Sequence, residues 1–138
     1  MAVKRDTPLK WPIKAPPPWA FPAFNSGNYA GAQTGYANYL SLWVSETAAQ
    51  IKVPKCRITK IRVNVLSNTT ITASTLTLRK NAADTTITGT IPAVGTGQYE
   101  FTGSIDFAEG DLMCIKIVIG DNAAKVLGIY GGTVVMEV

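Results

Sequence analysis

From residue 37 to the end of the chain, apolar and polar side chains alternate with a period of two. The pattern is clearest in residues 58–66 and 112–119, where large apolar residues recur at every second position. The side chains expected to face inward are Ile61, Val63, Val65, Met113, Ile115, Ile117 and Ile119. A strand with one face on the core and the other in water has this period, and an amphipathic helix does not. The sequence therefore predicts an antiparallel β protein.

Clusters of Gly, Pro, Asn and Asp interrupt the alternation about every 8–12 residues, which is the spacing of turns in β-sandwiches. We expect about eight strands, the last two separated by Gly131-Gly132. In the threonine-rich stretch 69–80 the alternation changes register near Ser74, which predicts a bulge or a bend. Residues 45–53 could form one short helical turn. The predicted fold class is all-β, a single jelly-roll sandwich of antiparallel strands.

Six of the eight prolines lie between residues 8 and 22, so this stretch can form neither a helix interior nor a central strand. It is expected to be extended, with polyproline II character around residues 16–18. Residues 25–36 are rich in Gly, Asn and Ser and are predicted to form a loop. We therefore divide the chain into an extended arm and loop, residues 1–36, and a β-sandwich domain, residues 37–138.

The proline-rich arm also carries large aromatic side chains, which a free linker rarely has because nothing favours their exposure. A stiff, aromatic segment is typical of one that packs against a surface, since it loses little conformational entropy on docking. The residues predicted to bind a partner are Trp11, Pro16, Pro17, Pro18, Trp19, Phe21 and Phe24. The cations predicted to steer the arm towards an acidic surface are Lys4, Arg5, Lys10 and Lys14.

The net charge of the chain is +4, and most of the excess lies in residues 1–24, where four cations face one acid, Asp6. Arms that bind nucleic acid usually concentrate more Lys and Arg, so no nucleic-acid partner is expected.

The most apolar run, residues 112–119, contains Lys116 and is far shorter than the ~20 residues of a membrane span. Prolines interrupt the stretch where a secretion signal would be continuously apolar, so neither a membrane span nor such a signal is expected.

The chain contains no histidine, which excludes Ser-His-Asp and Cys-His triads and every metal site that needs an imidazole. Three carboxylates, Asp106, Glu109 and Asp111, lie close together in the sequence and could bind calcium. Residues 108–111 are also of types that form tight turns, and we favour a turn over a calcium site. Cys56 and Cys114 permit one disulfide at most and are expected to be thiols within strands. We predict no enzymatic activity, no catalytic residue, no metal and no cofactor.

Threonine is frequent in residues 68–77 and 84–90. On a solvated sheet, threonine supplies β-propensity without an apolar patch, and this is the simpler interpretation. The alternative is a hydroxyl-rich face that binds sugar and offers an aromatic ring for stacking. The candidate rings are Tyr36, Tyr39 and Trp43.

The stretch from Ile61 to Ile119 resembles the small jelly-roll virion proteins of tailed phages in the order of its strands and turns. The resemblance rests on the strand LTLRKN, a turn, the segment TTITGTIPAVGTGQYEFTGSIDFAEGD and a following apolar strand. Decoration, head-fibre and tail-fibre proteins of the tumour-necrosis-factor-like or C1q-like type share this order. The resemblance implies a non-enzymatic structural protein, commonly trimeric, attached to a capsid or tail. The aromatic, proline-rich arm is a departure from the generic domain.

These features together predict a virion structural protein, of the capsid decoration, cement or head-fibre kind. Its arm would dock onto the phage capsid or a neighbouring virion protein, and the resemblance implies a homo-oligomer, a trimer. Two other functions stay open. One is a receptor- or carbohydrate-binding module of a tail fibre. The other is a single-jelly-roll capsid protein, against which the modest charge of the arm and the small body count.

Overall fold

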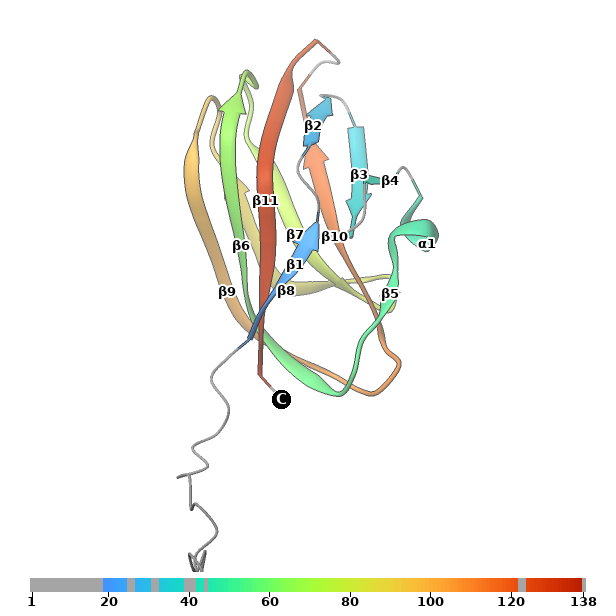
Figure 1. Cartoon of the computed structure of the whole chain (residues 1–138). Coiled ribbons are helices and arrows are strands. Elements are labelled where there is room, and N and C mark those ends of the chain that lie inside the picture. Colours follow the sequence, from blue (N-terminus) through green and yellow to red (C-terminus); the bar gives the residue numbers. More distant parts are fainter. Residues whose placement is uncertain are drawn as a thin grey trace, which may run out of the picture.

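A computed structural model describes residues 19–24, 27–30, 33–38, 42–43, 45–121 and 124–137. In this part of the chain, two antiparallel sheets pack face to face with their apolar sides inward (Figure 1). The first sheet has the strand order β1-β11-β6-β9, and β2 also pairs with β11. The second has the order β4-β3-β10-β7-β8, and β5 also pairs with β10.

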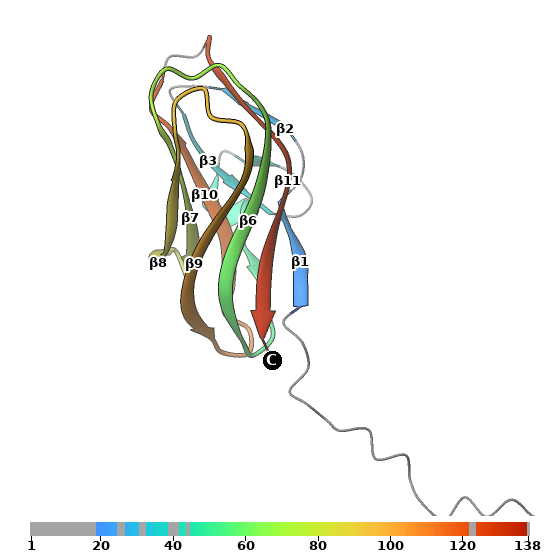
Figure 2. The same ribbon diagram turned by 90° about the vertical axis from the view of Figure 1, so that its left-hand side faces the viewer.

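The strands of the first sheet are β1 (Trp19–Phe24), β2 (Gly27–Ala30), β6 (Cys56–Asn68), β9 (Gly97–Phe107) and β11 (Val126–Glu137). The strands of the second sheet are β3 (Gln33–Ala37), β4 (Leu42–Trp43), β5 (Ile51–Lys52), β7 (Ser74–Lys80), β8 (Ala83–Ile91) and β10 (Leu112–Ile119). One helical turn, α1 (Glu46–Ala49), lies in the stretch where a single short turn was predicted. Figure 2 shows the side of the sandwich along which β8 and β9, the edge strands of the two sheets, lie next to each other.

The core lies between the two sheets, and it confirms the alternation expected from the sequence. All seven side chains predicted to face inward from residues 58–66 and 112–119 are buried in it. Between them on the outer face lie charged side chains such as Arg62 and Lys116. The predicted fold class, an all-β sandwich of antiparallel strands in a jelly-roll-like arrangement, is therefore confirmed.

Eight of the eleven strands in the described residues have five or more residues, in agreement with the expected number, and β2, β4 and β5 are shorter. One detail of the predicted strands is wrong. The last two predicted strands are one, because Gly131, with a φ of +152°, carries β11 through an irregularity instead of ending it. Of the bulge or bend expected near Ser74, the structure has the bend: the chain bends at residues 71–72, and β7 begins just after it, at Ser74.

The sandwich also begins earlier than residue 37. Residues 25–36 were predicted to be a loop, but they contain β2 and most of β3, which pair with β11 and β10. A glycine-rich stretch has low β-propensity, so here tertiary pairing outweighs the local preference. Strand β1 lies at the edge of its sheet, which is where a strand containing Pro22 is tolerated.

Only part of the predicted partner-binding set falls in the described residues. Trp19, Phe21 and Phe24 belong to β1, whose backbone pairs with β11 of the same chain. Their predicted role in partner binding stays a prediction. The remaining predicted residues lie outside the described part of the chain: Lys4, Arg5, Lys10, Trp11, Lys14, Pro16, Pro17 and Pro18.

Candidate functional site

Five residues from five strands lie opposite one another across the second sheet. The register runs from Trp43 in β4 through Tyr36 in β3 and Lys116 in β10 to Thr77 in β7 and Thr88 in β8. In β3, β10, β7 and β8 a neighbouring residue along the strand is buried in the core. Because successive side chains of a strand point to opposite faces, Tyr36, Lys116, Thr77 and Thr88 point outward.

A second row lies two residues away along each strand, and its side chains point the same way. Its members are Thr34, Val118, Thr75 and Thr90. We call these four residues, together with Tyr36, Lys116, Thr77 and Thr88, the threonine face. The two threonines of β8 and that of β3 are exposed, whereas Thr77 is only 5% exposed. With strands about 4.8 Å apart, the face spans ~14 Å from β3 to β8.

Hydrogen bonds fix the hydroxyl groups at the centre of the threonine face. The Oγ1 atoms of Thr77 and Thr88 lie 2.8 Å apart, and Thr88 Oγ1 donates to the carbonyl oxygen of Leu76 at 3.1 Å. Since Thr88 uses its only hydrogen on that carbonyl, Thr77 must be the donor between the two hydroxyls. One acceptor position of the exposed Thr88 oxygen is then left for a ligand.

Lys116 of this face is the first of four alternating charges that are linked by ion pairs. Lys116 Nζ lies 2.9 and 2.7 Å from the two carboxylate oxygens of Asp84, and Asp84 also accepts from Arg79 Nη1. Arg79 forms a second, two-pronged pair with Glu46 of α1, at 2.7 and 2.9 Å. The bonds from Lys116 and Arg79 lower the pKa of Asp84, and the bond to Glu46 raises that of Arg79. The four charges cancel and hold α1 on the sheet.

Both thiols are buried and neither is bonded to the other, as the sequence suggested. Cys114 is 1% exposed, and its Sγ lies 3.8 Å from Glu46 Oε1. Burial, and then the nearby carboxylate, raises the pKa of Cys114 to about 12. Burial also raises the pKa of Cys56. A thiol that stays protonated at neutral pH is a poor nucleophile, so both groups behave as structural side chains.

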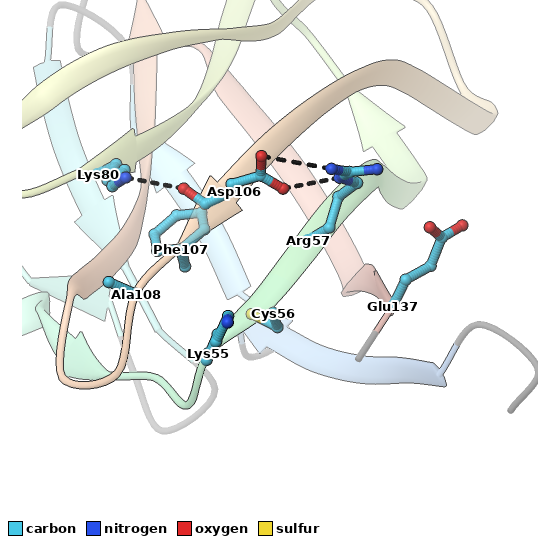
Figure 3. A pocket seen from close by; sticks show the side chains of 8 residues that line it. All are labelled: Lys55, Cys56, Arg57, Lys80, Asp106, Phe107, Ala108 and Glu137. Atoms are coloured by element: carbon cyan, nitrogen blue, oxygen red, sulfur yellow. Dashed lines mark hydrogen bonds and ion pairs between the residues drawn. The ribbon is translucent and has the colours of Figure 1, made fainter. Parts of the chain in front are cut away.

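An open pocket of about 880 Å³ lies at the end of the sandwich where β6 begins and β9 and β11 finish (Figure 3). The buried side chains of Phe107 and Cys56 contribute apolar surface, and charged groups surround them. The full set of lining residues is Lys55, Cys56, Arg57, Lys80, Asp106, Phe107, Ala108 and Glu137. Sequence reasoning did not find this pocket, because its walls come from strands far apart in the chain.

Most of the charges around this pocket are paired. Arg57 makes a two-pronged contact with Asp106, at 2.7 and 3.4 Å, and its hydrogen bond lowers the pKa of that carboxyl group. Lys80 Nζ lies 3.2 Å from Asp111 Oδ2 and also donates to the carbonyl oxygen of Asp106 at 2.7 Å. Such a rim leaves little uncompensated charge for an ionic ligand. The pocket is therefore the weaker of the two candidate sites.

The carboxylate cluster near this pocket forms a turn, as predicted. Asp111 Oδ2 accepts from the Ala108 amide at 2.8 Å, and Gly110 has the positive φ, +83°, that the turn requires. The carboxylate of Asp106 takes no part in the turn and instead accepts a hydrogen bond from Arg57. Within the described residues, no three Cys, Asp or Glu side chains are grouped so that they could hold a metal ion. No helix in the same part of the chain has the length and apolar character to cross a bilayer.

The structure brings together two of the three predicted sugar-stacking residues. Tyr36 and Trp43 hold opposite register positions in β3 and β4, whereas Tyr39 lies outside the described residues. Sequence reasoning did not foresee that Lys116 and two threonines would continue the same row. It also missed Glu46, Arg79 and Asp84, which come from three different elements, α1, β7 and β8.

Comparison with known proteins gives distant similarities only. No family model and no curated protein matches the chain. Among solved structures, the chain is similar to a GH26-CBM35 β-(1,4)-mannanase of Podospora anserina, with 14% identity and a TM-score of 0.45. That match covers 88% of this chain but only 28% of the mannanase chain.

A second similar structure is the CBM36-1 domain of a multidomain xylanase from the hindgut metagenome of Trinervitermes trinervoides. The identity is 12% and the TM-score 0.42, over 85% of this chain and 95% of that domain. Similarity this distant does not assign a function to the chain.

Proposed function

We propose that the protein is a non-catalytic binding module that holds a carbohydrate on the threonine face. A carbohydrate-binding module is one of the alternatives that the sequence leaves open. The register of the second sheet favours it over a virion structural protein or a capsid protein. The observation that carries the proposal is the alignment of Tyr36, Lys116, Thr77 and Thr88 across four strands, with Trp43 opposite Tyr36.

This alignment supplies both kinds of contact that a sugar needs. An aromatic ring presents an apolar surface to the C–H groups of a pyranose, and hydroxyl and ammonium groups bond its hydroxyls. Tyr36 is half-buried, so its ring is held in place while part of it stays accessible. Thr88 and Thr90 are exposed, and Lys116 is held by Asp84. Of these groups, Thr88 and Lys116 are held by hydrogen bonds before a ligand arrives, which reduces the entropy lost on binding.

Affinity gel electrophoresis against a panel of soluble polysaccharides tests the proposal. The wild type is expected to be retarded by at least one polysaccharide, and Tyr36→Ala to weaken that binding about tenfold, equivalent to ~1.4 kcal/mol. Tyr130→Ala is the matched control, because Tyr130 is a tyrosine of the other sheet that is 66% exposed. No retardation by any polysaccharide, or equal losses in the two variants, would contradict the proposal.

A second candidate function is assembly into a virion through the amino-terminal arm. One observation favours it: Trp19, the first described residue, pairs with Met136 and so lies close to Glu137, which lines the pocket. The arm would dock onto a capsid protein or a neighbouring subunit, in the virion, with the chain forming a homo-oligomer such as a trimer. Aromatic anchors would supply most of the interface energy.

The arm is tested by the mass of the protein in solution, measured by sedimentation equilibrium. The deletion should stop at residue 18, because Trp19 begins a paired strand. If the arm docks onto a neighbouring subunit, the whole chain is multimeric and the shortened chain, checked for folding by circular dichroism, is monomeric. If the whole chain is a monomer, the arm does not dock onto a neighbouring subunit. If the shortened chain is still a multimer, the subunits assemble through the sheets.

A further inference from the structure

We infer that the threonine face selects uncharged carbohydrate and that Asp84 is the residue that rejects anionic sugars. This inference rests on the proposed function. It concerns the class of ligand, which the aromatic and hydroxyl groups alone leave open.

The first step concerns the charge within the face. Lys116 is its one charged member, and both oxygens of Asp84 lie within 2.9 Å of its Nζ. Arg79, the next cation, is shared between Asp84 and Glu46. Both of these cations therefore have a carboxylate partner, and an anionic ligand finds no unpaired cation in this group of four charges.

The second step concerns which charge a ligand meets. The side chain of Asp84 is 50% exposed, whereas those of Lys116 and Arg79 are 20% and 13% exposed. The carboxylate is thus the most accessible charge of the group. A uronate or sulfate that approaches Lys116 must come close to Asp84, and two like charges at that distance repel each other. A neutral hydroxyl can instead donate to Asp84.

The experiment changes only this charge. Asp84→Asn keeps the size of the side chain and an acceptor oxygen but leaves Lys116 without a counter-charge. The control is Glu100→Gln, because Glu100 likewise bridges two cations, Lys60 and Arg62, but belongs to the other sheet. Both variants change the net charge equally, so any general attraction of anionic polymers affects both alike.

The probes are pairs of polysaccharides with the same backbone and different charge. Hydroxyethyl cellulose is compared with carboxymethyl cellulose, and dextran with carboxymethyl dextran, by affinity electrophoresis at low salt. The wild type is expected to prefer the neutral member of a pair. Asp84→Asn should bind the carboxymethyl member about three- to tenfold more tightly than the wild type does, and Glu100→Gln should not. The gain should disappear at high salt, because exposed charges are screened.

Different failures separate the inference from the proposed function. If the wild type prefers the carboxymethyl member and Tyr36→Ala abolishes that binding, the proposed function stands and the inference is wrong. Equal gains in Asp84→Asn and Glu100→Gln also overturn the inference. If the wild type binds neither member of either pair nor any of the wider panel, both are wrong. Should thermal melting show that Asp84→Asn is unfolded, Asp84→Ser takes its place.

Discussion

The ring of Phe101 in β9 lies against Gly89 in β8, so closely that a Cβ atom at Gly89 would stand 1.8 Å from Phe101 Cδ1. Two residues away along each strand the roles are reversed: the large side chain, Ile87, comes from β8, and the glycine, Gly103, from β9. Each glycine makes room for a large side chain of the opposite sheet. These contacts close the side of the sandwich at which both sheets end.

Gly89→Ala is therefore expected to destabilise the protein by about 3 kcal/mol, at the upper end of what overpacking of a core costs. Urea unfolding followed by circular dichroism measures the change. Gly120→Ala is the control and should have a small effect, because the closest atom to its Cβ would be Thr72 Oγ1 at 3.7 Å. In a Phe101→Ala background the cost of Gly89→Ala should fall, and an unchanged cost would show that the ring is not the obstacle.

Removal of Glu46 should destabilise the protein more than removal of an exposed acid. The Arg79 and Glu46 side chains are only 13% and 17% exposed, so Glu46→Ala leaves a shielded guanidinium with one partner fewer and should cost about 1–3 kcal/mol. Asp106→Ala is the matched case and should cost less, because its pair with Arg57 is 73% and 52% exposed and is screened by solvent. Equal unfolding free energies for the two variants would contradict this explanation of how α1 is held.

Val94 is expected to be a position at which the protein can be made more stable. It has a φ of +50°, which a β-branched residue rarely adopts, and its side chain is 64% exposed. Its amide donates to the Thr70 carbonyl at 3.0 Å, which fixes the strained conformation. Val94→Asn keeps that bond and suits the left-handed region, so it should raise the free energy of unfolding by ~1 kcal/mol. A loss of stability would show that Val94 makes contacts worth more than the strain.

Asp84 should make stability depend on pH in the acid range. Hydrogen bonds from Lys116 and Arg79 lower its pKa in the folded protein, so the folded state favours the charged form more than the unfolded state does. This contribution is complete above the ordinary aspartate pKa of about 3.9 and is lost as the pH falls through the lowered value. The urea midpoint of Asp84→Asn should therefore fall less steeply below pH ~4 than that of the wild type. Parallel profiles would contradict the assignment.

Much of the fold could be predicted from local patterns. The alternation in residues 58–66 and 112–119 identified the core side chains of β6 and β10, because a strand that is half-buried must alternate. The turn at residues 108–111 was also correct, because Gly110 and Asp111 supply their own local geometry. Strands β2 and β3 were missed, since their stability comes from β11 and β10 and not from their own glycine-rich sequence.

The sequence by itself determined that this chain forms a two-layered β structure, because a period of two leaves one face of each strand that must be buried. It also supplied the threonines, Tyr36 and Trp43 as candidates for sugar contact. Only the tertiary structure decided that Tyr36, Lys116, Thr77 and Thr88 share one row, and that Asp84 neutralises the cation within it. The reason is that register across β3, β10, β7 and β8 depends on hydrogen bonds between segments distant in the chain, which no local pattern encodes.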